Sequence, residues 1–327
     1  MDNPRRSPKS QGRGRTALLE RFGAFFLSSQ SRTNGARERG RQACWPCDRG
    51  VSRPEGRSGV ADIRVGIAGL GAIGRVVARH ISKGIPGLTL TAVAARDQAK
   101  AQAWLEHEKI AAALVDLDAL PQHCDLAVEC APAAALEQIC RPMLAEGKRV
   151  MVLSAGALLP RPELIELAIG NGGQIIVPTG ALLGLDAVTA AAEGEIKSVR
   201  MTTRKPPDGL AGAPYLVAND ISVEGLNAPK RVFVGTAREA AKGFPANVNV
   251  VAALSLAGIG PDRTTIEIWA DPGVTRNCHS IEVEADSARL SFAIENVPSE
   301  NPRTGRITAL SVVAALRKLT APIRVGT

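Results

Sequence analysis

Two groups of residues in this chain have the types and spacing to carry out chemistry. The first is the glycine turn Gly69-x-Gly71-x-x-Gly74, which lies between a short apolar run and a stretch with helical periodicity. The second is the pair Cys278-His279, which holds one of the four histidines of the chain. A glycine turn in this position lets phosphates approach a helix N-terminus, and histidine moves protons near neutral pH. The sequence therefore suggests a nucleotide site and a candidate acid–base residue.

Each glycine of the turn has its own physical task. Gly69 permits the tight turn, Gly71 leaves room for a pyrophosphate, and Gly74 allows the helix to pack closely on the strand. The helix that begins at Ala72 and Ile73 offers free backbone N–H groups and its positive dipole end to the phosphates. The motif is weak by itself, but the strand–turn–helix order around it is the context it requires. We expect NAD or NADP to bind here; the alternative is a glycine-rich turn that binds nothing.

The end of the second strand leaves the choice of cofactor open. Dinucleotide-binding domains often place an acidic residue there to hold the adenosine ribose. This chain has Ala95, Arg96 and Asp97 instead. Arg96 could lie over the adenine or meet the 2′-phosphate of NADP. The alternative is that Arg96 is solvated and Asp97 only caps the next helix.

The elements that would position these residues fall into two groups. From Ile63 to about Gly180, near-continuous apolar strands alternate with helices, which is typical of a parallel sheet covered on both faces. After Gly180, segments with inward–outward alternation predominate and few helices are expected between them. These segments are 196–205, 231–236, 264–271, 278–286 and 288–296.

The predicted fold class is therefore α/β, with a Rossmann doubly wound parallel sheet plus a second α+β domain that has a mixed or antiparallel sheet. A last helix over 304–320 has apolar spacing suited to packing back onto the first domain. We expect a dinucleotide-binding domain from residues 61–181 plus 300–327, and a substrate and dimerisation domain from residues 182–299.

The net charge of +8 belongs to the N-terminal segment. Residues 1–60 hold 13 Lys and Arg and 5 Asp and Glu, a difference of +8, and the other 267 residues hold 27 of each. A basic folded face for nucleic acid is therefore not indicated. Segment 1–60 has too few apolar residues to fold alone, and it is interpreted as a disordered extension, an Arg-rich targeting peptide, or the product of a start codon assigned too far upstream, with translation beginning near Val60.

Cysteine and histidine spacing indicates neither a metal site nor a disulfide framework. Cys44 and Cys47 form a C-x-x-C pair, but no strand precedes it and no helix follows it. The other cysteines are interpreted as small hydrophobic residues of a protein in a reducing cytoplasm. No transmembrane segment and no secretory signal are found in the sequence. We therefore expect a cytoplasmic protein without a metal.

Beyond these local patterns, the chain from Ile63 almost to its C-terminus resembles the L-aspartate dehydrogenase family. The resemblance is carried by the motifs GLGAIG, VECA, LSAGAL, PTGALLGLDA, TRKPP, DRTTIEIWADP, NCHSI and NPRTGRI, and by the long block from Gly235 to Gly260. It implies NAD(P)-dependent oxidation of L-aspartate to iminosuccinate, which water converts to oxaloacetate and ammonia. It also implies a homodimer. By position, Ala181 and Asn249 correspond to cofactor contacts and His279 corresponds to the active-site histidine.

The implied chemistry suits a histidine, because the substrate ammonium must lose a proton before hydride can leave the α-carbon. The alternative is a histidine at a strand edge without a catalytic role. Lys205 and Thr304 are the candidate donors to the substrate carboxylates, together with Ser154 and the backbone N–H groups around it. Asp271 would either orient His279 or only turn the chain.

Two further functions remain open at this point. The chain could bind NAD(P) without catalysis and act as a regulator. It could also be a related amino-acid or semialdehyde dehydrogenase in which Cys278 is a nucleophile. Neighbouring residues of a strand point to opposite faces, so Cys278 and His279 are poorly placed for proton transfer to each other.

Overall fold

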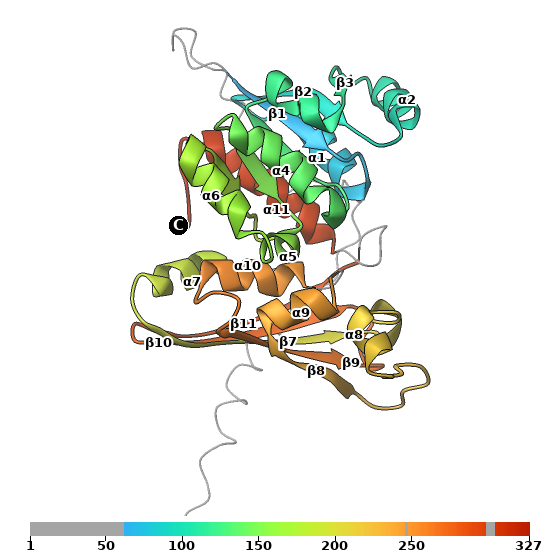
Figure 1. Cartoon of the computed structure of the whole chain (residues 1–327), viewed down its shortest axis with the longest axis vertical. Helices are drawn as coiled ribbons and strands as arrows, with labels where there is room; N and C mark the ends of the chain where they lie inside the picture. Colours follow the sequence, from blue (N-terminus) through green and yellow to red (C-terminus); the bar gives the residue numbers. More distant parts are fainter. Residues whose placement is uncertain (1–61, 246–247, 299–304) are drawn as a thin grey trace, which may run out of the picture. The chain divides into compact units, whose positions relative to one another are not determined.

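The computed structural model describes residues 62–245, 248–298 and 305–327. The basic segment 1–60, with Cys44 and Cys47, lies outside the described residues, and so does Thr304. Two sheets form the framework of the described part, and each is covered by helices that follow its strands in the sequence (Figure 1).

The first sheet has six parallel strands in the order β3-β2-β1-β4-β5-β6, so the predicted Rossmann sheet is confirmed. This order places the glycine turn after the strand at which the direction of winding reverses, where dinucleotides bind in such sheets. The strands are β1 (Ile63–Ala68), β2 (Leu88–Ala94), β3 (Ala113–Val115), β4 (Leu126–Glu129), β5 (Arg149–Val152) and β6 (Gln174–Ile176).

Apolar side chains on both faces hold the first sheet between its helices. Val65, Ile67 and Val128 pack on one face with α1, while Ala127, Val150 and Val152 pack on the other with α4. Burial on both faces explains the continuous apolar runs of the strands. The helices are α1 (Ala72–Ser82), α2 (Gln98–Glu108), α3 (Leu120–His123), α4 (Leu136–Ala145), α5 (Ala155–Leu158) and α6 (Pro162–Asn171), with short 3-10 turns at η1 (Leu117–Ala119) and η2 (Ala133–Ala135).

The helix ends follow local chemistry that the sequence indicated. The α1 helix stops before Gly84, whose φ of 101° belongs to the left-handed region that glycine adopts without strain. Asp97 caps α2, and its Oδ1 accepts a hydrogen bond from the Lys100 N–H at 2.9 Å. After Pro132, the chain forms the short η2 turn and then α4.

The second sheet has five strands in the order β11-β10-β7-β9-β8. Its neighbours run antiparallel except for β7 and β9, which are parallel, so the sheet is mixed, within the prediction. The strands are β7 (Ile196–Lys205), β8 (Lys230–Thr236), β9 (Thr264–Ala270), β10 (Asn277–Ala285) and β11 (Arg289–Asn296).

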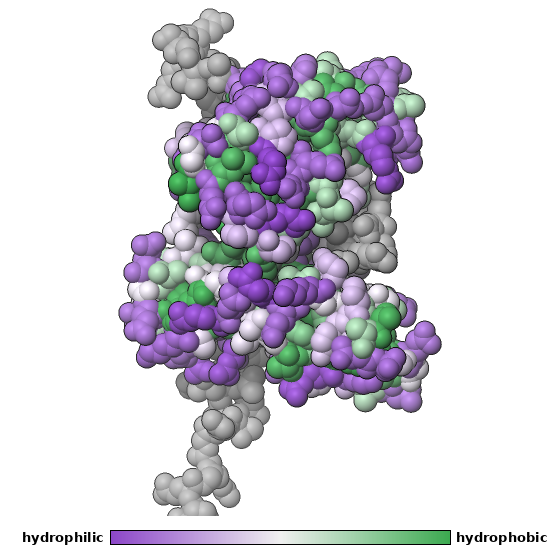
Figure 2. Space-filling model, viewed as in Figure 1, coloured by the Kyte–Doolittle hydropathy of each residue, from purple (hydrophilic) through white to green (hydrophobic). Residues whose placement is uncertain are grey.

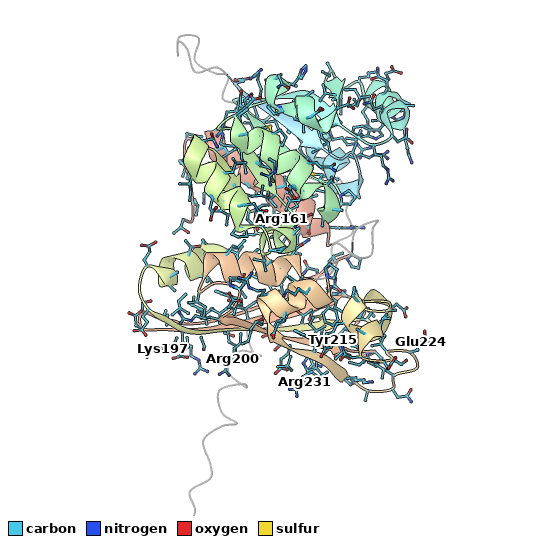
Figure 3. All side chains as sticks on the ribbon, viewed as in Figure 1. Arg161, Lys197, Arg200, Tyr215, Glu224 and Arg231 are labelled. Atoms are coloured by element: carbon cyan, nitrogen blue, oxygen red, sulfur yellow. The ribbon has the colours of Figure 1, made fainter. Side chains whose placement is uncertain are left out.

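Helices cover only one face of the second sheet within the described part of the chain (Figure 1). We call this face the inner face and the opposite one the outer face. The inner face carries buried apolar side chains such as Met201, Ile268 and Ile281, whereas outer positions such as Arg200 and Arg231 point away from the helices (Figure 3). The helices of this region are α7 (Leu185–Ala192), η3 (Pro207–Gly209), α8 (Pro214–Ala218), α9 (Ala237–Gly243) and α10 (Asn249–Ala257).

These helices are more numerous than the sequence suggested. The α10 helix is buried on nearly every side and therefore lacks the apolar stripe by which a surface helix is recognised. The α9 helix begins with a capping box, in which Thr236 Oγ1 accepts from the Glu239 N–H and the Glu239 side chain accepts from the Thr236 N–H. Strand alternation dominated the interpretation of this region and hid both helices.

The last helix, α11 (Arg306–Thr320), packs on α1 as the sequence indicated. Its buried residues Val312, Val313 and Leu316 join the same apolar cluster as Val77 and Ile81. Among the described residues, no helix is long and apolar enough to cross a membrane. The visible surface is mostly hydrophilic, with small apolar patches between the charged residues (Figure 2).

The three glycines of the turn differ in what surrounds them. Gly69 has a φ of 101° and lies against the backbone of Cys130, and a Cβ atom on Gly74 would lie 2.0 Å from the Gly69 carbonyl oxygen. A Cβ atom on Gly71 would meet nothing within 4 Å. Gly69 and Gly74 are therefore required by the fold itself, whereas the space at Gly71 is open to a ligand at the start of α1. This open cradle fits a dinucleotide pyrophosphate.

The variants Gly74→Ala and Gly71→Ala should separate these two requirements. Gly74→Ala should lower the free energy of unfolding by about 1–3 kcal/mol, because a backbone clash cannot be relieved by a rotamer change. Gly71→Ala should leave the stability of the cofactor-free protein nearly unchanged but weaken NADH binding. Thermal denaturation without cofactor and a fluorescence titration with NADH measure the two effects. Equal effects of both variants on stability would contradict this distinction.

Candidate functional site

His279 lies on the inner face of β10, near the start of that strand. Its side chain is almost fully buried, with 4% of the residue exposed, and Nδ1 lies 3.1 Å from Thr203 Oγ1 of β7. The register pairs these two residues directly across the strands. His279 is thus held in place by a hydroxyl group and does not sit at a solvated strand edge.

Lys205 is the second charged group on this face. It lies two residues beyond Thr203 at the end of β7, and 4% of it is exposed. Burial lowers the pKa of Lys205 to about 8. Burial, and secondly the nearby charge of Lys205, lower the pKa of His279 to about 3. The imidazole is therefore neutral at pH 7 and can accept a proton.

We call the four buried polar residues at this end of the inner face the polar end: Thr203, Lys205, His279 and Asn296. Asn296 closes β11 and is 3% exposed. Further along the same strands, the inner face becomes apolar with Met201 and Ile281. Polar groups are seldom buried in this way without a partner or a function, so the polar end is the candidate substrate site.

The loop after β6 comes close to the polar end. Asn296 Nδ2 donates to the carbonyl oxygen of Ala181 at 3.0 Å. On the other side of the loop, the Gly180 N–H donates to Ser311 Oγ of α11 at 3.0 Å. Ala181, a predicted cofactor contact, is thereby tied to both β11 and α11 through its loop.

Glu129 is a buried carboxylate that the sequence analysis did not single out. It ends β4 and is 0% exposed. Its Oε2 accepts from the N–H groups of Leu153 and Ser154, at 3.0 and 2.8 Å, and its Oε1 accepts from Ser154 Oγ at 3.1 Å. Burial raises the pKa of Glu129 to about 7. The hydroxyl of Ser154, a candidate substrate donor, is thus engaged with Glu129.

The same loop continues to a second predicted cofactor residue. Ser154 is followed by α5, where the Gly156 N–H donates to Asn249 Oδ1 at 3.2 Å. Asn249 is the first residue of α10. Glu129, Ser154 and Asn249 therefore form a chain of contacts from β4 through the loop after β5 to the second sheet region.

At the ribose end of the predicted cofactor site, Arg96 is exposed just after β2. The carboxylate of Asp97 caps α2 and is therefore used by the protein itself. On α1, Arg75 Nε donates to the Leu70 carbonyl oxygen at 3.2 Å, and its guanidinium lies over the ring of Trp104. Basic rather than acidic side chains therefore surround this end of the turn.

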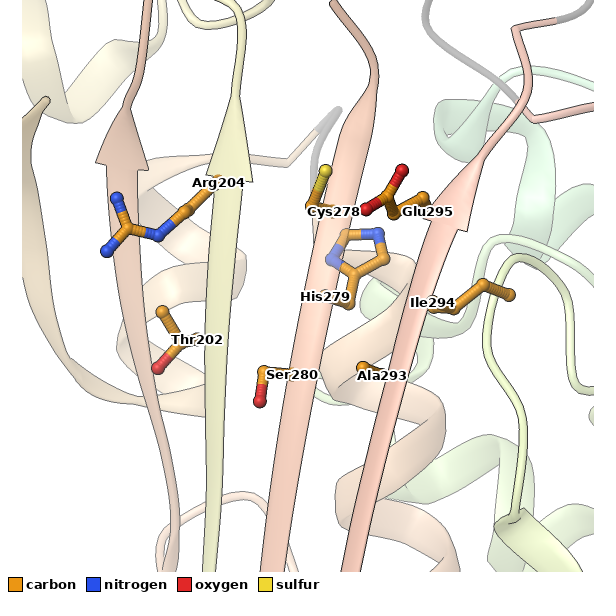
Figure 4. Close-up of a pocket in the computed structure, with 8 residues that line it drawn as sticks. All are labelled: Thr202, Arg204, Cys278, His279, Ser280, Ala293, Ile294 and Glu295. Carbon is orange, nitrogen blue, oxygen red and sulfur yellow. The ribbon is translucent and has the colours of Figure 1, made fainter. Parts of the chain in front are cut away.

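Cys278 and His279 lie on opposite faces of β10, as the strand geometry predicted. A pocket of about 330 Å³ is lined mainly by outward-facing residues such as Thr202, Arg204 and Cys278, and His279 also lines it (Figure 4). Burial and the nearby Glu295 raise the pKa of the Cys278 thiol. The geometry does not favour Cys278 as a nucleophile activated by His279.

Arg204 and Asp271 form an ion pair beside this pocket, with Arg204 Nη1 3.0 Å from Asp271 Oδ2. Asp271 Oδ1 also accepts from the Gly273 N–H at 2.8 Å. These contacts agree with the interpretation that Asp271 turns the chain. Among the described residues, no group of three or more His, Cys, Asp or Glu side chains could hold a metal ion.

The structure therefore brings some of the predicted residues together and separates others. His279 and Lys205 share the polar end, and Ala181 joins them through Asn296. Thr203 and Asn296 had not been predicted as site residues. Strand alternation could have identified them. Each lies an even number of positions from an apolar inner-facing residue, so its side chain falls on the inner face, where a polar residue is unexpected.

Comparisons with known proteins support one family along the described chain. Residues 186–319 match the family model described as aspartate dehydrogenase, C-terminal. Residues 69–178 match the model described as homoserine dehydrogenase, NAD binding domain. The boundary between the two matches falls in the loop that contains Ala181.

Two curated relatives are similar over nearly their whole length. The L-aspartate dehydrogenase of Bradyrhizobium diazoefficiens is 58% identical over 267 residues, which cover 82% of this chain and 95% of the relative. L-aspartate dehydrogenase 3 of Bordetella bronchiseptica is 56% identical, with 81% and 98% covered.

A solved structure shares the fold. The crystal structure of aspartate dehydrogenase from Thermotoga maritima superposes with a TM-score of 0.63 at 24% identity and covers 81% of this chain and 99% of that one. At this identity the likeness supports the two-sheet architecture, while the curated relatives carry the family assignment. The chain belongs to the L-aspartate dehydrogenase family.

Proposed function

We propose that this protein oxidises L-aspartate with NAD(P) to give iminosuccinate, which water hydrolyses to oxaloacetate and ammonia. Family membership supports the substrate, and the glycine turn with its open space at Gly71 supports the cofactor. The observation that carries the chemistry is the polar end, where a neutral imidazole and a buried lysine share one face of the sheet.

The assignment of roles follows from charge. The two carboxylates of aspartate require cationic or N–H donors, and Lys205 supplies a buried cation. When bound, the cofactor accepts hydride from the α-carbon. His279 accepts the proton that the ammonium releases, and the Nδ1 contact with Thr203 fixes the orientation of its ring. Thr304 remains a proposed carboxylate donor outside the described residues.

Substrate binding should also make His279 a stronger base. In the free protein, burial and the charge of Lys205 hold its pKa near 3. The carboxylates of a bound substrate offset the charge of Lys205, the second cause of the low pKa after burial, and so raise the pKa of the imidazole. The base is therefore neutral before the substrate arrives and becomes more basic when the carboxylates are in place.

The loops around the proposed nicotinamide site have supporting roles in this proposal. Glu129 holds Ser154 and Leu153, and Ser154 acts mainly through this positioning contact. Asn249 and Ala181 carry the contacts that the family resemblance implies. In this proposal, the glycine turn and the first residues of α1 bind the pyrophosphate. These residues are Gly69, Gly71, Ala72, Ile73 and Gly74.

We also propose a homodimer formed through the outer face of the second sheet. No described helix covers this face, and Trp269 lies there beneath Arg204 and Arg231, at 4.8 and 5.8 Å from its ring centre. Aromatic and arginine side chains are enriched in protein interfaces. The molar mass from light scattering tests this, and a monomer mass would contradict it.

The cytoplasmic location likewise stays a prediction.

His279→Ala should lower kcat for L-aspartate by roughly 10²–10⁴-fold while NADH binding is retained, because the proton acceptor is lost but the glycine turn is not. His107→Ala is the matched control, since the His107 side chain is 82% exposed and lies on α2. Reduction of NAD and of NADP at 340 nm, assayed separately, measures the effect. Cofactor binding without any aspartate turnover in the wild type would instead favour the regulatory alternative or another substrate.

A second prediction concerns pH and stability. Because the folded protein holds the pKa of His279 near 3, below its ordinary 6.5, it binds fewer protons than the unfolded chain between these values. The contribution of neutral His279 to the free energy of unfolding is present above pH 6.5 and is lost as the pH falls towards 3. Between pH 6.5 and 5, the free energy of unfolding of the wild type should fall by up to about 1.4 kcal/mol per pH unit more than that of His279→Ala. Parallel curves in urea titrations would contradict this.

The cofactor choice gives a third prediction. Asp97 is occupied as a helix cap and Arg96 is exposed after β2, so we expect the protein to accept NADP as well as NAD. Arg96→Ala should reduce kcat/KM with NADP about tenfold and with NAD by much less, since only NADP carries the 2′-phosphate. Equal losses of kcat/KM with both cofactors would show that Arg96 does not contact the 2′-phosphate.

A further inference from the structure

Within the described part of the chain, the side-chain amide of Asn296 makes a hydrogen bond through only one of its two polar atoms. Its Nδ2 donates to the Ala181 carbonyl oxygen at 3.0 Å. Its Oδ1 is buried and has no hydrogen-bond partner among the described residues. A buried acceptor without a donor costs free energy, so natural proteins keep few of them.

The orientation of this amide follows from its partner. A backbone carbonyl only accepts, so the nitrogen end of Asn296 must face Ala181. Turning the amide over would bring two acceptors together and lose the hydrogen bond that the group makes to Ala181. The unused acceptor is therefore fixed at the end of β11.

The neighbouring backbone packs closely against this oxygen. Gly305, directly before α11, lies so close that a Cβ atom there would be 2.8 Å from Asn296 Oδ1. Any other residue at 305 would press on the amide and cover part of it. Because residue 305 is a glycine, no side chain from that position presses on the oxygen, and the described residues supply no donor to it.

The position of Asn296 relative to His279 indicates which donor fits. His279 pairs with Ile294, two residues before Asn296 on the same face of β11. Such diagonal neighbours lie roughly 7–8 Å apart, a gap that a small ligand can bridge. In L-aspartate both carboxylates are acceptors at neutral pH, and only the amino group donates.

We propose that Asn296 Oδ1 accepts a hydrogen bond from the amino group of the substrate, on the side of that group away from His279. This rests on the proposed function. One N–H of the group then points to Asn296 while another faces the imidazole that takes its proton. Asn296 would select for an amine and align the nitrogen lone pair with the Cα–H bond from which hydride leaves.

The test compares two ligands that differ only in this group. L-aspartate carries the amine, and succinate is the same four-carbon dicarboxylate without it. Calorimetry with the full chain and saturating NADH gives the Kd of each ligand, because no turnover occurs with the reduced cofactor. Asn296→Leu removes the acceptor with little change in volume, and Asn296→Asp keeps an acceptor oxygen but loses the donor to Ala181. Ser311→Ala loosens the same loop from the other side and leaves Asn296 intact.

Asn296→Leu should weaken aspartate binding by about tenfold or more and change succinate binding by less than about twofold. Asn296→Asp and Ser311→Ala should keep the preference of the wild type for aspartate. If Asn296→Leu does not fold, Asn296→Ala, which also removes the acceptor, carries the same expectation.

Three outcomes would overturn the proposal. The first is an equal loss of affinity for both ligands, which would limit the role of Asn296 to holding the loop that contains Ala181. The second is weaker NADH binding with an unchanged aspartate-to-succinate ratio, which would assign the oxygen to the cofactor. The third is loss of the preference in Asn296→Asp. Failure of the proposed function would appear separately, as absence of turnover by the wild type with oxidised cofactor.

Discussion

Burial of polar side chains at one end of an apolar sheet face is the constraint on which the rest of the site depends. Thr203, Lys205, His279 and Asn296 are each at most 4% exposed, on a face whose other positions pack against α10. Each such group costs free energy unless it finds a partner. The fold meets this cost partly by pairing Thr203 with His279 and Asn296 with Ala181, and we propose that the remaining acceptor of Asn296 binds the substrate.

The same constraint explains how the loops of the first sheet are held. Loops at the carboxyl ends of parallel strands carry backbone groups that no ladder satisfies, and these ends bind the ligand in such folds. Here the loop after β5 is tied through Ser154 to Glu129 and through Gly156 to Asn249, and the loop after β6 is tied to Ser311 and Asn296. A ligand that contacts these loops therefore meets surfaces already ordered by side chains from β4, α10, α11 and β11.

Much of this framework could be predicted from sequence because it depends on local patterns. Apolar runs and period-two alternation located most strands, and Gly84 and Asp97 marked helix ends. The α10 helix was missed because burial on nearly every side removes its periodicity, and the four-residue α5 is too short to have one.

The site was predictable only where one residue type carries the chemistry. His279 and the glycine turn have that property, and so does Lys205 as a basic residue at an inner-facing position of β7. Glu129 ends an apolar run, and its importance comes from a hydrogen bond to a loop 24 residues later in the chain. Asn296 matters only because Ala181, 115 residues earlier, takes one end of its amide. Such long-range pairings are set by the register of the sheets, which no local pattern reports.

The electrostatics of the polar end link affinity to basicity in the proposed mechanism. A lysine near a catalytic histidine is unfavourable in the free protein, because it lowers the pKa of an imidazole that burial has already lowered. The same charge attracts a dicarboxylate, and the bound dicarboxylate cancels its effect on the imidazole. An amine without carboxylates would neither bind Lys205 nor restore the base. In the proposed mechanism, selection for the substrate and part of the activation of the proton acceptor are therefore linked through Lys205, which lies two residues from the threonine that holds His279.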